Sequence, residues 1–216
     1  MKGTNDIHKI RKEYTKKTLE LHEVNKNPLS QFRVWFDEAL QSKEIEPNAM
    51  IVSTVKTNGT PSARVLLIKE ITPTGMVFYT NYESNKGKEL EANPAVCATF
   101  FWPMLERQVR IEGVVKKYDA QKADTYFKSR PLGSQIGAIS SPQSQPIERE
   151  TLEQLVTENT SKYSANAKGL KRPENWGGYI IEPNYYEFWQ GRASRLHDRI
   201  VFEKKGDDWK IDRLAP

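Results

Sequence analysis

Apolar positions between residues 28 and 43 recur every three or four residues, which is the spacing of one face of a helix. Asn27 and Pro28 open this run as a capping residue and a proline suited to the first helical turn. The sequence therefore predicts an amphipathic helix over residues 28–43. Residues 7–23 are charged with only scattered apolar positions, so they predict either a weakly amphipathic basic helix or a mobile arm.

Further along the chain, short apolar runs bounded by turn residues indicate β-strands. Asn58-Gly59 separates the first two runs, and this pair is typical of a tight hairpin because both residues tolerate a positive φ. The predicted strands cover residues 49–57, 60–69, 75–81, 95–102, 107–118, 178–189, 199–204 and 209–213.

Helices are also predicted between the strands, each with a signal at its start. Ser84 caps a helix that ends at Ala92, Asp119 caps one that ends near residue 129, and Pro146 opens a third. Loops are expected around Pro131 and the glycines that follow it, and over residues 164–176. Because hairpin-linked strands dominate, the pattern predicts an α+β fold, mainly antiparallel β: a barrel with peripheral helices.

Composition narrows the class of protein. The 216 residues suffice for a real core, and numerous aromatic residues argue against disorder. Apolar residues are somewhat sparse, which fits a core completed across a dimer interface. Cys97 is the only cysteine, so no intrachain disulfide forms. Without an apolar segment long enough for a membrane or a signal peptide, we expect a cytoplasmic protein that binds no membrane.

Several kinds of chemistry have no signature in the sequence. The histidines, His8, His22 and His197, show no zinc-ligand spacing, so no metal is expected. Neither a phosphate-cradling glycine loop, a dinucleotide fingerprint nor a nucleophile elbow is present. If the protein is an enzyme, an organic cofactor is the simplest source of its chemistry. The net charge of +5 leaves nucleic acid, anionic lipid or phosphorylated small molecules as partners.

Two groups of residues that contain cations lie at predicted helix ends, where they could bind an anion. Lys86 and Lys88 lie in the first turn of a predicted helix, where cations oppose the helix dipole unless an anion is bound. On this stretch alone a solvated lysine-rich turn is the favoured interpretation. Tyr126, Arg130 and Ser134 form the second group, which suits a phosphate ester or equally a helix C-terminus.

A third group lies near the C-terminus. Arg195 and His197 would share one face of a predicted strand that continues to Arg199, while Asp198 would point the other way. Three cations on one face repel each other unless something anionic or aromatic lies across them. This grouping makes His197 look more like a site residue than a structural histidine.

These residues lie in blocks that closely resemble the pyridoxine/pyridoxamine 5′-phosphate oxidase family. The blocks, in family order, are RVLLIK (64–69), FYTN (78–81), FFW…LERQVRIEG (100–113), YFKSRPLGSQIGA (126–138), FWQG (188–191), RLHDR (195–199) and WKIDRLAP (209–216). The resemblance implies an FMN-binding split β-barrel with Greek-key-like connectivity, assembled as a homodimer with FMN at the subunit interface. We expect a basic N-terminal arm over residues 1–26 and a single split-barrel domain over residues 27–216.

The resemblance also implies which residues form the site. It assigns Arg195 and His197 to catalysis, with His197 either binding the ring oxygen of the substrate or moving a proton. Asn85 stands where some members have an arginine that contacts the FMN phosphate, so Lys86 and Lys88 would compensate. The flavin set is Arg64, Val65, Leu66, Leu67, Ile68, Lys69, Tyr79, Thr80, Lys86, Gln108, Gln143, Ser144, Trp189 and Arg199. The substrate set is Lys69, Tyr126, Arg130, Ser134, Arg195 and His197, with Arg11 and Tyr14 from the N-terminal arm.

The implied reaction is the oxidation of pyridoxine 5′-phosphate and pyridoxamine 5′-phosphate to pyridoxal 5′-phosphate, with FMN as cofactor and O2 as electron acceptor. Two alternatives remain open at this point. One is a flavin-binding barrel that acts on another substrate or stores cofactor. The other is a basic nucleic-acid-binding barrel, which ranks last because no run of surface aromatic residues lies between the cations.

Overall fold

A computed structural model describes residues 6–164 and 169–216 of the chain. Its strands form a sheet in the order β2-β1-β5-β6-β7-β4-β3, and β8 pairs with β7 and with β9. The chain divides into two compact units. The first unit comprises Met1–Pro47, Thr99–Ile111 and Tyr185–Pro216, and the second comprises Asn48–Ala98 and Glu112–Asn184. The long strands β5 (Ala95–Trp102), β6 (Arg107–Lys117) and β7 (Trp176–Gln190) contribute residues to both.

The second unit begins with the predicted hairpin. β1 (Ala49–Val55) and β2 (Pro61–Leu67) pair antiparallel, and Gly59 in their turn has φ +82°. Only glycine adopts that conformation without strain, so the turn prediction is confirmed. β4 (Met76–Asn81) pairs antiparallel with β3 (Glu70–Ile71) and with the first part of β7. The α+β class with mainly antiparallel strands is thus confirmed.

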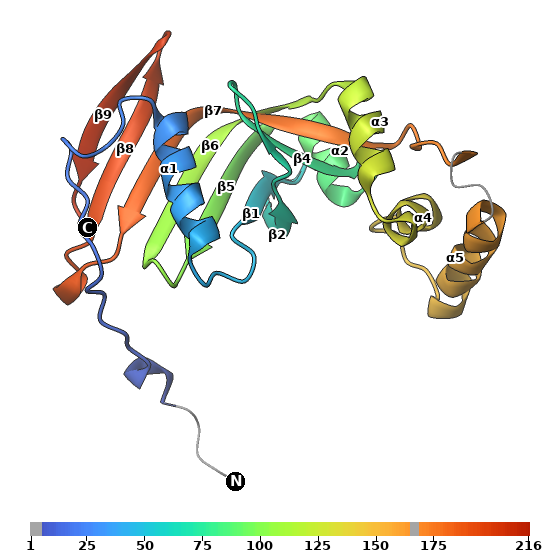
Figure 1. Cartoon of the computed structure of the whole chain (residues 1–216), viewed down its shortest axis with the longest axis horizontal. Helices are drawn as coiled ribbons and strands as arrows, with labels where there is room; N and C mark the ends of the chain where they lie inside the picture. Colours follow the sequence, from blue (N-terminus) through green and yellow to red (C-terminus); the bar gives the residue numbers. More distant parts are fainter. Residues whose placement is uncertain (1–5, 165–168) are drawn as a thin grey trace. The chain divides into compact units, whose positions relative to one another are not determined.

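In the described part of the second unit there are four α-helices, and two of them have the predicted capping residues. Ser84 accepts a hydrogen bond from the backbone of α2 (Asn85–Ala92), and Asp119 does the same for α3 (Ala120–Ser129). α4 (Leu132–Ser140) and α5 (Arg149–Ser164) lie side by side (Figure 1). The prediction of a loop after Pro131 is therefore wrong, because α4 occupies that segment. Part of the predicted loop over residues 164–176, residues 165–168, lies outside the described residues.

The first unit is built around an aromatic core. The predicted helix is α1 (Pro28–Gln41), which buries Phe32 and Trp35. The Phe32 ring lies 5.0 Å from that of Phe100, and the Trp35 ring lies 5.2 Å from that of Phe188 (centroid distances). β8 (Asp198–Lys205) and β9 (Asp208–Leu214) form the C-terminal hairpin, drawn in red in Figure 1.

Two segments of the first unit decide between or correct expectations from the sequence. Of the two alternatives for residues 7–23, the basic helix is wrong, because the 3-10 turn η1 (Ile7–Lys9) is followed by chain without regular structure; the mobility of this arm stays a prediction. Arg195 belongs to another 3-10 turn, η3 (Ala193–Arg195), and β8 begins only at Asp198. The prediction that Arg195 and His197 share a strand face is therefore wrong. Over the described residues, the helices are all too short or too polar to span a membrane.

Candidate functional site

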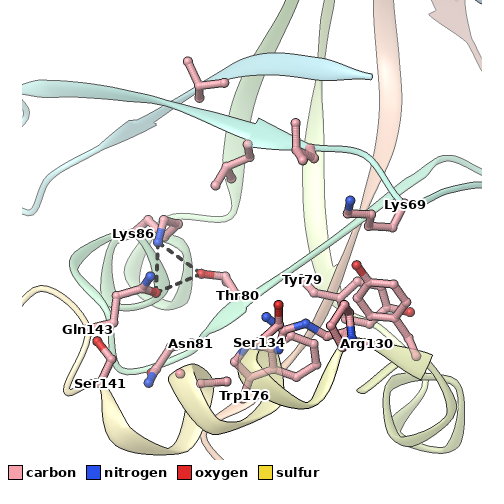
Figure 2. Close-up of a pocket in the computed structure, with 17 residues that line it drawn as sticks. Lys69, Tyr79, Thr80, Asn81, Lys86, Arg130, Ser134, Ser141, Gln143 and Trp176 are labelled. Atoms are coloured by element: carbon pink, nitrogen blue, oxygen red, sulfur yellow. Dashed lines mark hydrogen bonds between the residues drawn. The ribbon is translucent and has the colours of Figure 1, made fainter. Parts of the chain in front are cut away.

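The second unit contains a cavity of about 730 Å³ between β2, β4, α3 and α4. Figure 2 shows Lys86, Thr80 and Gln143 together at one side of it, and Arg130, Ser134 and Trp176 at the other. Eleven of the predicted site residues line this cavity: Val65, Leu66, Leu67, Lys69, Tyr79, Thr80, Lys86, Tyr126, Arg130, Ser134 and Gln143.

Lys86 forms the first cationic corner of the cavity. Its Nζ donates to Thr80 Oγ1 at 3.1 Å, and to Ser84 Oγ and Gln143 Oε1 at 3.3 Å each. Burial lowers the pKa of Lys86, and the positive charge of Arg64 lowers it further, whereas Glu89 opposes the shift. A bound anion would reverse this desolvation penalty, so the corner suits a phosphate. Asn85 and Lys88 on the same helix are exposed and do not line the cavity.

Arg130 forms the second cationic corner, at the start of α4. Its Nη1 is buried and has no hydrogen-bond partner in the structure. The guanidinium lies 4.8 Å from the centroid of the Trp176 ring, and burial lowers the pKa of Arg130 although Tyr126 opposes the shift. Pro131, the N-cap of α4, provides no side-chain hydrogen bond. A partly buried guanidinium beside an uncapped helix start is an arrangement that an anion would complete.

Three aromatic rings form a stack along the cavity. The ring of Tyr79 lies 4.1 Å from that of Tyr126 and 5.4 Å from that of Trp176, with interplanar angles of 20° and 9°. Burial, followed by the charge of Glu70, raises the pKa of Tyr79 to about 12, so its hydroxyl stays protonated. The stack offers flat apolar surface beside two cations, which suits a planar ring that carries a phosphate.

Several residues that line the cavity were not predicted from the sequence. Trp176 and Asn81 are the most prominent, and Pro131, Gly137, Ala138 and Ser141 complete the lining. Two glycines follow Trp176 on β7, and both lie close to tyrosine side chains. A Cβ on Gly178 would lie 3.0 Å from a ring carbon of Tyr79, and one on Gly177 would lie 2.1 Å from the Tyr82 hydroxyl. Only glycine allows the tyrosines to pack this closely.

Three residues of the predicted flavin set lie in the second unit without lining the cavity: Arg64, Ile68 and Ser144. Arg64 donates to Glu89 at 3.0 Å and to the hydroxyls of Ser62 and Thr54. Ile68 is buried, and Ser144 is exposed with φ +72°. The guanidinium of Arg64 thus holds α2 against β2 in the structure, and its flavin contact remains a prediction.

The first unit brings a second group of predicted residues together. The ring of His197 lies 4.5 Å from that of Trp189, and the ring of Tyr14 lies 5.7 Å and 5.9 Å from those of Trp189 and His197. Arg11, Tyr14, Arg195 and His197 line one pocket of about 560 Å³. The structure therefore brings these arm residues and C-terminal residues together in one pocket, and their roles remain predictions.

The surroundings of His197 indicate its protonation state. Its Nδ1 accepts a hydrogen bond from the backbone N–H of Arg192 at 3.1 Å. Burial lowers the pKa of His197, the nearby Arg195 lowers it further, and Asp198 opposes the shift. The ring is therefore neutral at pH 7, with its proton on Nε2. In this state His197 can donate one hydrogen bond from Nε2 to a ligand in the pocket.

The arginines near His197 differ in their partners. Arg199 Nε donates to Glu187 at 2.7 Å, and Arg192 Nη1 donates to Asp198 at 3.1 Å. Within residues 6–164 and 169–216, the Arg195 guanidinium has no carboxylate partner, and the residue is exposed with φ +60°. A positive φ in a non-glycine residue costs about 1 kcal/mol or more and is typical of functional positions. Gln108, also predicted for the flavin, is half-buried on β6.

The carboxylates of Asp198 and Glu187 make the stability of the protein depend on pH. Burial alone would raise the pKa of Asp198, but hydrogen bonds from the Leu19 N–H, Arg213 and Arg192 lower it overall. Burial would likewise raise the pKa of Glu187, but hydrogen bonds from Arg199 and Arg110 lower it overall. In both groups the folded pKa lies below the unfolded one. Their contribution is therefore complete above the unfolded pKa and is lost as the pH falls through the folded value.

We expect Asp198→Asn to lower the free energy of unfolding at pH 7 by about 3 kcal/mol, because two arginines lose their buried partner. The same variant should show a smaller loss of stability than the wild type between pH 5 and pH 3. Urea unfolding at several pH values measures both effects. Parallel curves for the two proteins would contradict the assignment of the pKa shift to Asp198.

Comparison with known protein families identifies two matching regions. Residues 36–164 match a family described as pyridoxamine 5′-phosphate oxidase, and residues 176–216 match a pyridoxine 5′-phosphate oxidase C-terminal dimerisation region. A pyridoxine/pyridoxamine 5′-phosphate oxidase from Bordetella pertussis is 50% identical over 211 residues, covering 97% of this chain and 99% of that protein. The protein of the same name from Leptospira interrogans is 51% identical over 212 residues, covering 97% and 98%.

Solved structures give the same picture of the fold. PhzG from Burkholderia lata, crystallised with tetrahydrophenazine-1-carboxylic acid, superposes with a TM-score of 0.86 at 27% identity, covering 93% of this chain and 98% of that chain. An FMN-binding protein from Nostoc punctiforme, related to pyridoxamine 5′-phosphate oxidase, has a TM-score of 0.69 at 15% identity, covering 86% and 97%. The predicted split-barrel fold is confirmed by these likenesses.

Proposed function

The chain belongs to the pyridoxamine 5′-phosphate oxidase family, and from this premise we propose that it oxidises pyridoxine 5′-phosphate and pyridoxamine 5′-phosphate to pyridoxal 5′-phosphate. The observation that carries the proposal is the cavity of the second unit, where two cationic corners, Lys86 and Arg130, lie apart on a lining that also contains Lys69 and a stack of aromatic rings. Two phosphate-bearing rings, one of a flavin and one of the substrate, would need such a pair of anion sites.

The residues of this cavity fit FMN as the cofactor. Lys86, Thr80 and Gln143 would hold its phosphate, because the three side chains already converge and Lys86 is partly desolvated. Charge-assisted hydrogen bonds of this kind are each worth about 1.5–3 kcal/mol. When bound, FMN supplies the acceptor for the hydride that the substrate gives up, and we propose O2 as the final oxidant, with release of hydrogen peroxide.

The substrate phosphate would be held at the Arg130 corner. The partnerless Nη1 of Arg130 would gain an acceptor there, and Ser134 and Tyr126 offer hydroxyls on the same cavity wall. Arg195 would favour negative charge on the substrate ring. For His197 the structure supports binding of the ring oxygen, since its neutral state leaves Nε2–H as a donor. Precise placement of the ring by these groups accelerates the transfer.

We propose a homodimer with FMN at the subunit interface as the active form. The support comes from the match of residues 176–216 to a dimerisation region and from exposed apolar side chains such as Val65, which is 63% exposed on β2. Formation of a dimer would also complete a core that contains few apolar residues.

Oxygen uptake by the purified protein tests the proposed function. We expect uptake with either phosphorylated vitamer, dependence on FMN after the flavin has been removed, and formation of pyridoxal 5′-phosphate. Unphosphorylated pyridoxine is the matched control and should give much slower uptake, because Arg130 would have no anion to bind. A protein that binds FMN yet forms no pyridoxal 5′-phosphate would instead act on another substrate or store the cofactor.

A further inference from the structure

Within the N-terminal arm, residues 12–16 are held against the rest of the first unit by the buried carboxylate of Glu106. Glu106 lies in the turn between β5 and β6 and is 2% exposed. Its Oε2 accepts the backbone N–H of Thr15 at 2.9 Å and that of Lys16 at 3.1 Å. Lys12 Nζ lies 3.6 Å from its Oε1. One carboxylate thus binds two consecutive N–H groups of a segment that has no β-strand partner.

The backbone of Glu106 shows that the turn itself does not favour a glutamate. The residue has φ +56°, a left-handed conformation that glycine or asparagine adopts at lower cost. A glutamate at this position is unfavourable for the hairpin, and burying its charge is unfavourable as well. The hydrogen bonds to the arm are the interactions that offset both penalties.

Glu106 also fixes the surface on which Tyr14 rests. Its carbonyl oxygen accepts the backbone N–H of Gly191 at 2.7 Å. A Cβ on Gly191 would lie 2.7 Å from Cγ of Tyr14, so the tyrosine ring packs directly on the glycine backbone. The same ring contacts Trp189 and His197. The carboxylate of Glu106 therefore binds the arm, and its backbone carbonyl binds Gly191, on which the ring of Tyr14 packs.

We propose that Glu106 is a positioning residue, which holds the N-terminal arm so that Arg11 and Tyr14 close the pocket that contains Arg195 and His197. This role rests on the proposed function, because the pocket matters for turnover only if the substrate reaches it. Glu106 does not line that pocket and acts through the backbone of Thr15 and Lys16.

Glu106→Leu and Glu106→Gln form a matched pair of test variants. Leucine removes the acceptor at similar volume, whereas glutamine keeps one oxygen that can accept from Thr15 and Lys16. We expect trypsin to cleave after Arg11 and Lys12 at least about tenfold faster in Glu106→Leu, measured without substrate on the flavin-loaded dimer, and near the wild-type rate in Glu106→Gln. KM for pyridoxine 5′-phosphate should rise about tenfold in the leucine variant, with a smaller change in kcat.

Thr15→Pro provides a second route to the same contact. Proline has no backbone N–H, so this change removes one of the two donors while leaving Glu106 and its turn intact. Thr15 is exposed, so folding should be unaffected. We expect faster cleavage of the arm and a raised KM, and we expect Glu106→Leu to add less in the Thr15→Pro background than in the wild type, because both changes break one interaction.

The two readouts separate failure of this inference from failure of the proposed function. An arm that stays protected in Glu106→Leu, or fully additive effects with Thr15→Pro, would overturn the role of Glu106. Loss of arm protection in a protein that oxidises no phosphorylated vitamer would support the anchor and refute the oxidase. If Glu106→Leu does not fold, Thr15→Pro alone decides the question: unchanged cleavage and unchanged KM would overturn the proposal.

Discussion

Replacing Arg195 by methionine is expected to lower kcat/KM for pyridoxine 5′-phosphate about a hundredfold or more, while FMN binding stays unchanged. In the described part of the chain this guanidinium has no carboxylate partner, and it lies in a pocket with His197 and Tyr14. Its full charge is therefore available to a substrate ring that becomes electron-rich during oxidation. Stopped-flow reduction of the bound flavin, together with the flavin content of the purified variant, measures the two effects separately.

Arg195→Lys is the matched control for this prediction. Lysine keeps the charge but not the planar fork, so activity should lie between those of the wild type and the methionine variant. If the methionine variant lost FMN but turned over normally for each flavin bound, Arg195 would belong to the cofactor site. The division of the basic residues between flavin and substrate would then be wrong.

Replacing Arg130 by methionine should raise KM for both phosphorylated vitamers about a hundredfold, with a smaller effect on kcat at saturation. Arg130 has a buried Nη1 without a partner and lies over the face of Trp176, so a phosphate would gain a preformed and desolvated ligand. FMN affinity should change little, because its phosphate is assigned to Lys86. Steady-state kinetics and a flavin titration provide the two measurements.

Arg149→Met is the control for that experiment. The same arginine-to-methionine change is made here on α5, away from the cavity. The Arg149 side chain is 85% exposed, and its Nε lies 3.7 Å from Glu153 Oε1. Its kinetic constants should match those of the wild type. An equal rise of KM in both variants would indicate a general effect of net charge rather than a phosphate site at Arg130.

Local signals account for the parts of the fold that were predicted correctly. Asn27 and Pro28 start α1, Ser84 caps α2, and Gly59 closes the first hairpin. Each depends on a few neighbouring residues, and the chemistry of those residues is sufficient to form the element. The third group of basic residues was also recognised as unusual, although for a reason that the structure corrects.

Non-local contacts explain what the sequence did not reveal. α4 contains Gly133 and Gly137 and lacks a side-chain cap, so it looks like a loop; its Ile136 is nevertheless buried in a cluster with Phe127 and Trp176. Packing against those residues stabilises the helix despite weak propensity. The consequence for the site is direct, because α4 presents Ser134 to the cavity beside Arg130.

The prediction of a strand around Arg195 is wrong for a related reason. Ser194 and Arg195 both have positive φ, a conformation that their residue types disfavour. The sequence therefore did not indicate the turn η3, and the alternation of side chains suggested a strand instead. Contacts distant in sequence hold the neighbourhood in place. Asp198, for example, accepts the N–H of Leu19, 179 positions away along the chain. No local pattern could indicate such a contact.

A crystal structure of the protein with FMN and pyridoxal 5′-phosphate bound would show directly whether the cavity of the second unit binds two phosphates. We expect one phosphate within hydrogen-bond distance of Lys86 and Gln143 and the other on Arg130 and Ser134. Density for either phosphate elsewhere on the protein, with Arg130 Nη1 still lacking an acceptor, would contradict this expectation.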